Sequence, residues 1–179
     1  MLDWLQSHIS LNTLIWLFPI TFLLHDFEEI IFVETWFKKN YVRLEPKVPG
    51  RMKKVFRDLS KTNAARFSIP VLMQFIVYII ASYLAVEQNY YGLFLGVNAL
   101  FFLHIFSHVG QTLFFGTYAL GVGSAIVITL PYSIYLFYRL INETIISYLD
   151  LIQNLPYGLI SVGIVWYGHK LAAKILPDS

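Results

Sequence analysis

The chain has 179 residues, of which 57% are hydrophobic and 17% aromatic, and its mean hydropathy is +0.61. Only 13% are charged, far below the roughly 25% of ordinary soluble domains, so the composition predicts a membrane protein. The net charge of +2 is too small to indicate a nucleic-acid partner, and the absence of cysteine excludes disulfides, thiolate ligands and a cysteine nucleophile.

Five stretches are long enough to cross a bilayer as α-helices, at about 20 residues per crossing. They are residues 12–36, 64–86, 90–115, 119–141 and 155–175. The first has no preceding positive charges and no small-residue cleavage site after it, so we expect a retained helix rather than a signal peptide. Pro131 predicts a kink in the fourth, because proline removes a backbone hydrogen bond. The predicted fold is an all-α polytopic transmembrane bundle, with residues 1–179 in one domain.

The basic residues predict the orientation of this bundle. Ten of the thirteen lie between residues 38 and 66, and Lys and Arg accumulate in cytoplasmic loops. We therefore predict an outside N-terminus and a cytoplasmic C-terminus. Within the basic loop, residues 38–62, apolar side chains at helical spacing indicate either an amphipathic helix on the membrane surface or a solvated loop that only sets the topology. They are Val48, Met52, Val55, Phe56 and Leu59.

An acidic cluster interrupts the first apolar stretch, in the run His25-Asp26-Phe27-Glu28-Glu29. A charged side chain near the bilayer centre costs at least ~2.5–3.5 kcal/mol, so carboxylates at that depth mark a functional site. Glu28 and Glu29 follow His25 by three and four residues, which places all three on one side of a helix. The third stretch has His104 and His108 at the same spacing of four.

The two motifs also lie at equal depth. Counted from the expected helix ends at residues 36 and 115, His25 and His104 are each eleven residues deep, and Glu29 and His108 are each seven residues deep. At about 1.5 Å per residue this is ~10–16 Å inside the cytoplasmic helix ends. We therefore predict that His25, Glu29, His104 and His108 bind one divalent metal, with zinc the first choice and iron the second. Glu28 and Glu29 are the predicted catalytic carboxylates, and the sequence leaves open which is the ligand and which is the base.

Other polar side chains at similar depth are predicted to line the same cavity. They are Gln74, Gln111, Thr129, Tyr132 and His169. For each of them the alternative is a hydrogen bond between helices, and for the cluster itself the alternative is a buried polar network that holds helices together.

The run from His25 to Glu29 resembles the signature of the HXXEE family of small bacterial integral membrane proteins. The similarity covers residues 13–138 and includes His104 and His108 with Gln111, and the Pro131-Tyr132 pair. Relatives have Tyr-x-Pro-Gly in the turn after the second His helix, where this chain has Tyr118-Ala119-Leu120-Gly121. The resemblance implies an enzyme of the bacterial plasma membrane whose activity is not assigned.

These observations predict a metal-dependent membrane enzyme that hydrolyses a lipid or small amphipathic substrate with a metal-activated water. Its site would open toward the cytoplasmic half of the bilayer. One alternative is a non-haem iron oxygenase or desaturase. Others are an ion- or proton-coupled transporter that uses the same carboxylates, and a structural or signalling protein without a ligand.

Overall fold

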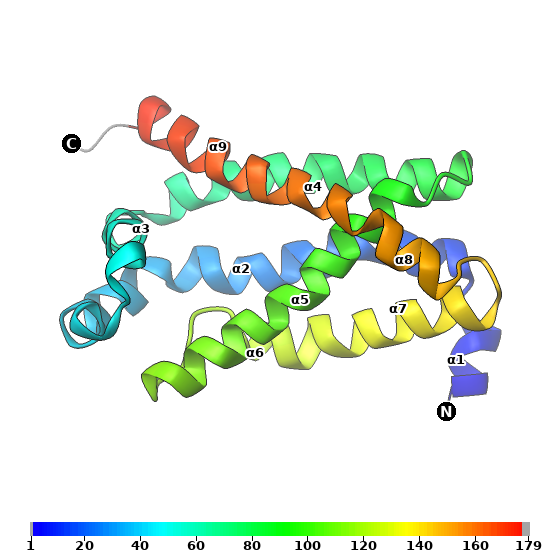
Figure 1. The fold of residues 1–179 in the computed structure, drawn as a ribbon, viewed down its shortest axis with the longest axis horizontal. Coiled ribbons are helices and arrows are strands. Elements are labelled where there is room, and N and C mark those ends of the chain that lie inside the picture. The colour runs from blue at the N-terminus through cyan, green and yellow to red at the C-terminus, as the bar shows by residue number, and fades with distance from the viewer. Residues whose placement is uncertain (1, 177–179) are drawn as a thin grey trace.

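The computed structural model describes residues 2–176, and over that range the chain is helical with no β-strand. Long helices run roughly along one axis of an elongated bundle, as Figure 1 shows. They are α2 (Leu11–Leu44), α4 (Ala64–Glu87), α5 (Gly92–Phe115), α7 (Leu130–Asn142) and α9 (Leu159–Ile175). The prediction of an all-α fold is confirmed.

Shorter helical segments connect the long helices and close the ends of the bundle. The α-helical ones are α1 (Leu2–His8), α3 (Lys53–Leu59), α6 (Val122–Ser124) and α8 (Tyr148–Asn154). The 3-10 segments are η1 (Glu45–Lys47), η2 (Gly50–Met52) and η4 (Leu155–Gly158), and η3 (Ala125–Thr129) is a π-helical segment.

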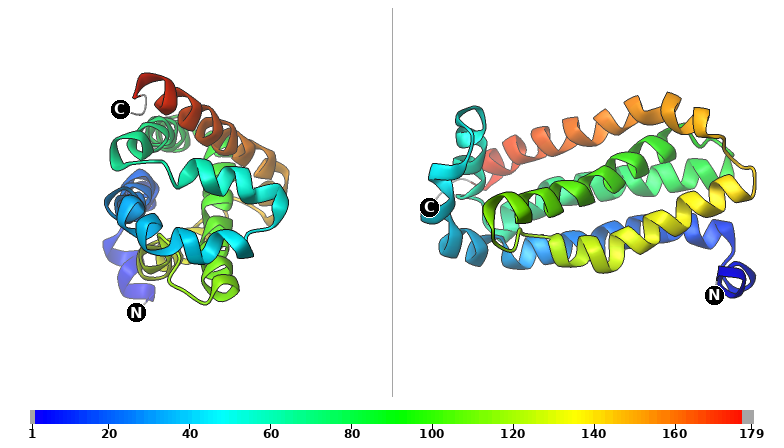
Figure 2. Two further views of the ribbon diagram at one scale, coloured as in Figure 1. Left: turned by 90° about the vertical axis from the view of Figure 1, so that its left-hand side faces the viewer. Right: turned by 60° about the horizontal axis from the view of Figure 1, so that its bottom comes forward.

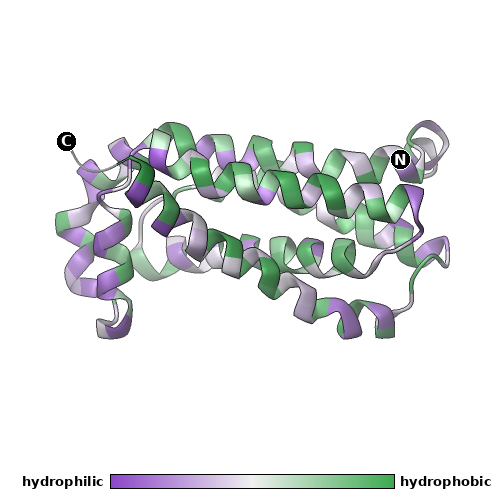
Figure 3. Ribbon diagram, turned by 90° about the horizontal axis from the view of Figure 1, so that it is seen from above, coloured by the Kyte–Doolittle hydropathy of each residue, from purple (hydrophilic) through white to green (hydrophobic). Residues whose placement is uncertain are grey.

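Within the described part of the chain, three helices are long and apolar enough to cross a membrane: Ala64–Glu87, Gly92–Phe115 and Val122–Asn142. Helices α2 and α9 run beside them in both views of Figure 2. Apolar residues cover the long helices, whereas hydrophilic residues gather at the end that carries α3 (Figure 3). These features are compatible with a membrane protein, and the number of crossings and the orientation of the termini stay predictions.

Helix α2 continues well past the end expected from the apolar run. Ser10 caps its N-terminus by accepting a hydrogen bond from the Thr13 amide, and it ends at Leu44, just before Pro46. Residues 38–44 are therefore helix rather than part of the expected basic loop. The reason is a buried stripe at helical spacing, since Phe37, Asn40 and Leu44 face inward while the lysines between them face outward.

The remaining basic segment folds against the end of the bundle (Figure 2, left). The amphipathic region is a short 3-10 turn followed by α3, instead of one continuous helix. Val48 is buried, and the Phe56 ring stacks on Tyr41 with centroids 5.6 Å apart. Met52 and Val55 stay exposed. Part of the predicted apolar face thus packs on α2, and the rest is open to the surroundings.

A π-helical turn directly precedes Pro131, where the sequence predicts a kink. The Leu130 amide donates to the Ala125 carbonyl five residues back, and α7 starts directly afterwards with the proline at its second position. Proline lacks an N–H and cannot continue the α-helical ladder, so a wider turn before it satisfies the backbone.

An aromatic core fills the bundle on the N-terminal side of His25. Phe18 and Phe22 of α2 each contact Tyr78 of α4, with ring centroids 4.6 and 4.7 Å apart. Phe94 and Phe101 of α5 complete the cluster against the same two α2 rings. All five side chains are buried, so aromatic rings fill the centre of this part of the bundle.

Candidate metal centre

Two helices bring four candidate ligands to one point. His25 and Glu29 lie on α2, His104 and His108 lie on α5, and one nitrogen or oxygen from each lies within 4.8 Å of all the others. His108 Nε2 is 2.8 Å from His104 Nε2 and 3.3 Å from Glu29 Oε1. The ring centroids of His25 and His108 are 5.0 Å apart. The predicted convergence is confirmed, and the group could hold a metal ion.

The spacing of these atoms fits a small cation. In a tetrahedral site with bonds of about 2.0–2.2 Å, neighbouring ligand atoms lie about 3.4 Å apart. The observed separations of 2.8 and 3.3 Å and the outer limit of 4.8 Å bracket that value. The separations are therefore compatible with four donors around one ion.

The centre is open on one side only. His25 and His108 are 1% and 3% exposed and Glu29 is buried, whereas His104 is exposed to the large cavity that it lines. His25 also contacts the ring of Phe101 at the edge of the aromatic core. A ligand can thus approach the group through the face that His104 presents.

Ser124 of α6 orients His25 from behind. Its hydroxyl lies 2.9 Å from His25 Nδ1 and donates to Glu28 Oε2 at 2.6 Å. With its proton committed to the carboxylate, the serine oxygen accepts from Nδ1–H, so the other ring nitrogen keeps its lone pair for the cluster. Such a hydrogen bond is the usual support of a metal-binding histidine.

Glu28 lies outside the four-residue group. Together with Ser124 and Tyr118 it forms what we call the supporting layer. Besides the Ser124 hydroxyl, it accepts the Tyr118 hydroxyl at 2.5 Å and the Ser124 amide at 2.7 Å. Partial burial and the bond to Glu28 raise the pKa of Tyr118 above its ordinary value, so this phenol stays a donor at neutral pH. Trp36 fixes the same turn by donating to the Tyr118 carbonyl at 2.7 Å. The geometry therefore places Glu29 with the ligands and Glu28 behind them.

Gly121 fills the space directly against two of the candidate ligands. Its φ of +83° lies in the left-handed region, and a Cβ there would sit 2.5 Å from Glu29 Oε1 and 2.8 Å from His108 Cε1. Only glycine meets both requirements without strain. The turn after α5 thus closes over the Glu29 and His108 side of the centre.

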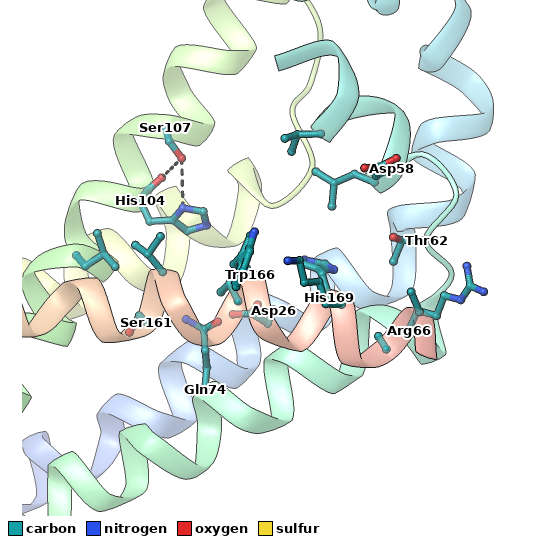
Figure 4. Close-up of a pocket in the computed structure, with 18 of the residues that line it drawn as sticks. Asp26, Asp58, Thr62, Arg66, Gln74, His104, Ser107, Ser161, Trp166 and His169 are labelled. Carbon is teal, nitrogen blue, oxygen red and sulfur yellow. Dashed lines mark hydrogen bonds between the residues drawn. The ribbon is translucent and has the colours of Figure 1, made fainter. Parts of the chain in front are cut away.

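A cavity of about 1020 Å³ reaches the exposed face of His104 (Figure 4). Of the predicted cavity residues, Gln74 and His169 line it. Gln111 is an exposed residue of α5 that is not part of the lining. Thr129 and Tyr132 are also not on its wall: Thr129 is buried, and the Tyr132 hydroxyl donates to the Leu14 carbonyl at 3.1 Å. Tyr132 thus makes a contact between helices, as the alternative interpretation expects.

Three site residues were not predicted from spacing. Ser124 has no sequence signal, because its role depends on α6 folding back onto α2. Tyr118 belongs to the turn motif noted in the family resemblance, but nothing in the sequence places its hydroxyl on Glu28. Asp26 is buried and lines the cavity, and its position inside the acidic run is the only signal it gives.

Fold and site together define an all-helical protein with membrane-length helices and a buried His/Glu group that could hold a metal ion. Residues 16–136 match the family described as "Protein of unknown function with HXXEE motif". The match covers more than half of the chain, and the protein belongs to this family. Its motif is the His25-to-Glu29 run that contributes two of the four candidate ligands. Searches of curated proteins and of solved structures found no match.

Proposed function

We propose that the protein is a metal-dependent integral membrane enzyme that hydrolyses a lipid or small amphipathic substrate. One observation carries this proposal: four metal-type donors lie within 4.8 Å of one another at the wall of a cavity of about 1020 Å³. Buried charged groups of this kind are expensive in a membrane protein and mark function more often than structure. A polar network that only joined helices would not need three imidazoles.

The proposed ligands are His25, Glu29, His104 and His108. Three imidazoles and one carboxylate suit Zn²⁺ first and Fe²⁺ second. A bound ion would polarise the substrate and lower the pKa of a water molecule beside it. His104 faces the cavity, so the substrate would meet the centre on this side.

The two glutamates take different roles in this proposal. Glu29 would hold the ion with one oxygen. Its other oxygen would take the proton of the water that attacks the ester carbonyl, and would give that proton to the alcohol released when the ester C–O bond breaks. Glu28 already accepts hydrogen bonds from Tyr118 and from the hydroxyl and amide of Ser124, so we assign it to positioning. Through Ser124 it fixes the ring of His25.

An enzyme fits better than a transporter because packed aromatic rings lie beyond the centre. A transport path would need polar groups that continue along the helices, whereas His25 contacts the ring of Phe101, which packs in turn on Phe18 and Phe22. Ion flux that depends on Glu29 in proteoliposomes would contradict this choice.

A non-haem iron enzyme that oxidises a hydrocarbon chain is the second candidate. The cavity wall beside His104 is apolar, with Leu100, Phe101 and Leu103 from the same helix, and such a wall suits an acyl or isoprenoid chain. Metal analysis of the purified protein separates the two functions. One equivalent of zinc with release of an acyl group from ester lipids supports the hydrolase, whereas iron with dioxygen consumption supports the oxidase.

The decisive assay compares the wild type with the Glu29→Gln variant on a panel of ester lipids. We expect hydrolysis by the wild type in the presence of zinc, and loss of both metal and activity in the variant. Equal hydrolysis by the two proteins would contradict the assignment of Glu29.

A further inference from the structure

We propose that the cavity beside His104 binds a single-chain amphiphile with an anionic head group. Such an amphiphile would be the substrate of the proposed enzyme, and only this catalytic role rests on the proposed function. Binding itself depends on the shape and charge of the cavity, and it can be measured on metal-free protein.

The end of the cavity beside α3 (Figure 4), which we call its mouth, is basic. Lys54 of α3, Lys61 in the following turn and Lys170 of α9 all line it, and Asp58 is the carboxylate among them. Lys170 Nζ lies 3.4 Å from the ring centroid of Trp166, which holds this ammonium group at the wall. The long lysine side chains can follow a head group, and the combined charge favours a carboxylate or phosphate.

The body of the cavity suits a hydrocarbon chain. Side chains from α2, α5 and α9 make most of its wall apolar: Phe22, Leu100, Phe101, Leu103, Val162 and Val165. The polar groups on the α4 side are already paired, because the Tyr78 hydroxyl lies 3.1 Å from both Gln74 Nε2 and Ser161 Oγ. These groups need no hydrogen bond from a ligand, so an apolar chain can lie against them without leaving them unpaired.

The charge distribution sets the direction of the ligand. Figure 4 shows His104 across the cavity from the part of α9 that carries Ser161 and Trp166, while Asp58 and Arg66 lie farther along, toward the mouth. Ser161 and Lys170 are nine residues apart on α9, or about 14 Å. The deeper lining has an acid, Asp26, and no Lys or Arg. The head group therefore stays at the mouth and the chain extends inward.

This direction specifies which part of the ligand reaches the metal centre. A bond several atoms below the head group, rather than the head group itself, would face His104. In a lysophospholipid that position is occupied by the ester, so the geometry agrees with the proposed hydrolysis. The volume of about 1020 Å³ lies at the upper end of ligand pockets, roughly 300–1,000 Å³, which favours one chain.

Trp166 offers a direct readout, because it lines the cavity. The experiment titrates metal-free protein in detergent with 9,10-dibromostearate and follows the quenching of tryptophan fluorescence. The Trp166→Phe variant identifies the cavity component, and the methyl ester of the same acid provides a neutral probe with the same chain. The test variant is Lys54→Gln/Lys61→Gln. Its matched control is Lys38→Gln/Lys39→Gln, which removes two exposed charges outside the cavity lining.

We expect saturable quenching by the acid that is absent in Trp166→Phe and weaker for the ester. Each mouth lysine should contribute about fivefold in affinity, so the double variant should bind at least tenfold more weakly, and the control should bind as the wild type does. Non-saturable quenching, equal affinity for acid and ester, or equal weakening in both double variants would overturn the proposal. As a second test, Val162→Trp places a large side chain in the lining and should abolish acid binding.

Lipid binding in the cavity and metal binding at the four-residue group can be tested separately. The Glu29→Gln variant should lose metal but bind dibromostearate as the wild type does, because Glu29 belongs to the four-residue group but not to the cavity lining. If the protein binds metal but shows no saturable, charge-dependent lipid binding, the proposed metal centre stands and the proposed substrate class is wrong. If it binds the lipid but no metal, the proposed lipid site stands and the proposed enzyme function is wrong.

Discussion

The Nε2 atoms of His104 and His108 lie 2.8 Å apart, one turn of α5 from each other. Two neutral imidazoles in this arrangement share one proton, so one nitrogen must donate and the other accept. A cation between them and Glu29 would instead use the lone pairs of both rings. The close approach therefore places the two ring nitrogens where they could share either a proton or a metal ion.

Removal of one ligand should strongly weaken binding of the metal ion. We predict that His104→Ala lowers zinc affinity at least tenfold, because it removes one of four donors. Competition titration with a chromophoric chelator measures this affinity. His169→Ala is the matched control, since His169 lines the same cavity from α9 but lies outside the four-residue group. Unchanged affinity in His104→Ala would remove this residue from the ligand set.

Loss of a residue of the supporting layer should lower metal affinity almost as much as loss of a ligand. Ser124→Ala removes the hydroxyl that links His25 to Glu28, and we expect a loss of roughly 10- to 100-fold in metal affinity. Ser133→Ala serves as comparison, because Ser133 is also buried but its hydroxyl has no hydrogen-bond partner among residues 2–176. Equal metal affinity in both variants would show that Ser124 does not position His25.

Alanine variants at two glycines distinguish the effect of backbone strain from the effect of crowding the site. Gly116 and Gly121 both have positive φ, at +61° and +83°, but only at Gly121 would a Cβ contact Glu29 and His108. Alanine at either position should cost about 1–2 kcal/mol of stability. Only Gly121→Ala should also lower metal affinity, by tenfold or more. If Gly116→Ala impairs binding equally, the effect is strain in the turn and not contact with the ligands.

Tyr118 links the turn after α5 to the HXXEE motif. Tyr118→Phe removes one donor from Glu28 at a partly exposed site, which should reduce stability by about 1 kcal/mol at neutral pH. The folded state raises the pKa of this phenol, so the protonated form is favoured by folding. Its stabilisation is present below about pH 10 and is lost as the pH rises past the raised pKa.

The measurement for Tyr118 is thermal unfolding of wild type and variant in detergent, at neutral and at strongly alkaline pH. The difference in Tm should shrink in alkali. A difference that stays constant across this range would mean that the hydroxyl contributes through packing alone.

The sequence predicts the helices and the principal site because both follow from local spacing. The i, i+4 pairs on two apolar stretches and their equal depth are enough to bring His25 and Glu29 to His104 and His108. The extension of α2 to Leu44 is missed, because apolar length marks the membrane crossing and not the end of the helix. An amphipathic continuation can carry a helix beyond the apolar run.

The supporting residues depend on contacts between distant segments. Ser124 reaches His25 across 99 residues, and Tyr118 reaches Glu28 across 90. No periodicity encodes such a pairing, since it arises when the Gly121 turn folds the start of α6 onto α2. The same reason explains Gln111 and Tyr132, whose depth is suitable but whose direction is fixed by helix packing.

The most direct test of the metal centre is an anomalous difference map from crystals of the zinc-loaded protein, collected at the zinc absorption edge. We predict one strong peak about 2.0–2.2 Å from donor atoms of His25, Glu29, His104 and His108. A map with no peak there, while the four side chains hydrogen-bond to one another, would contradict it.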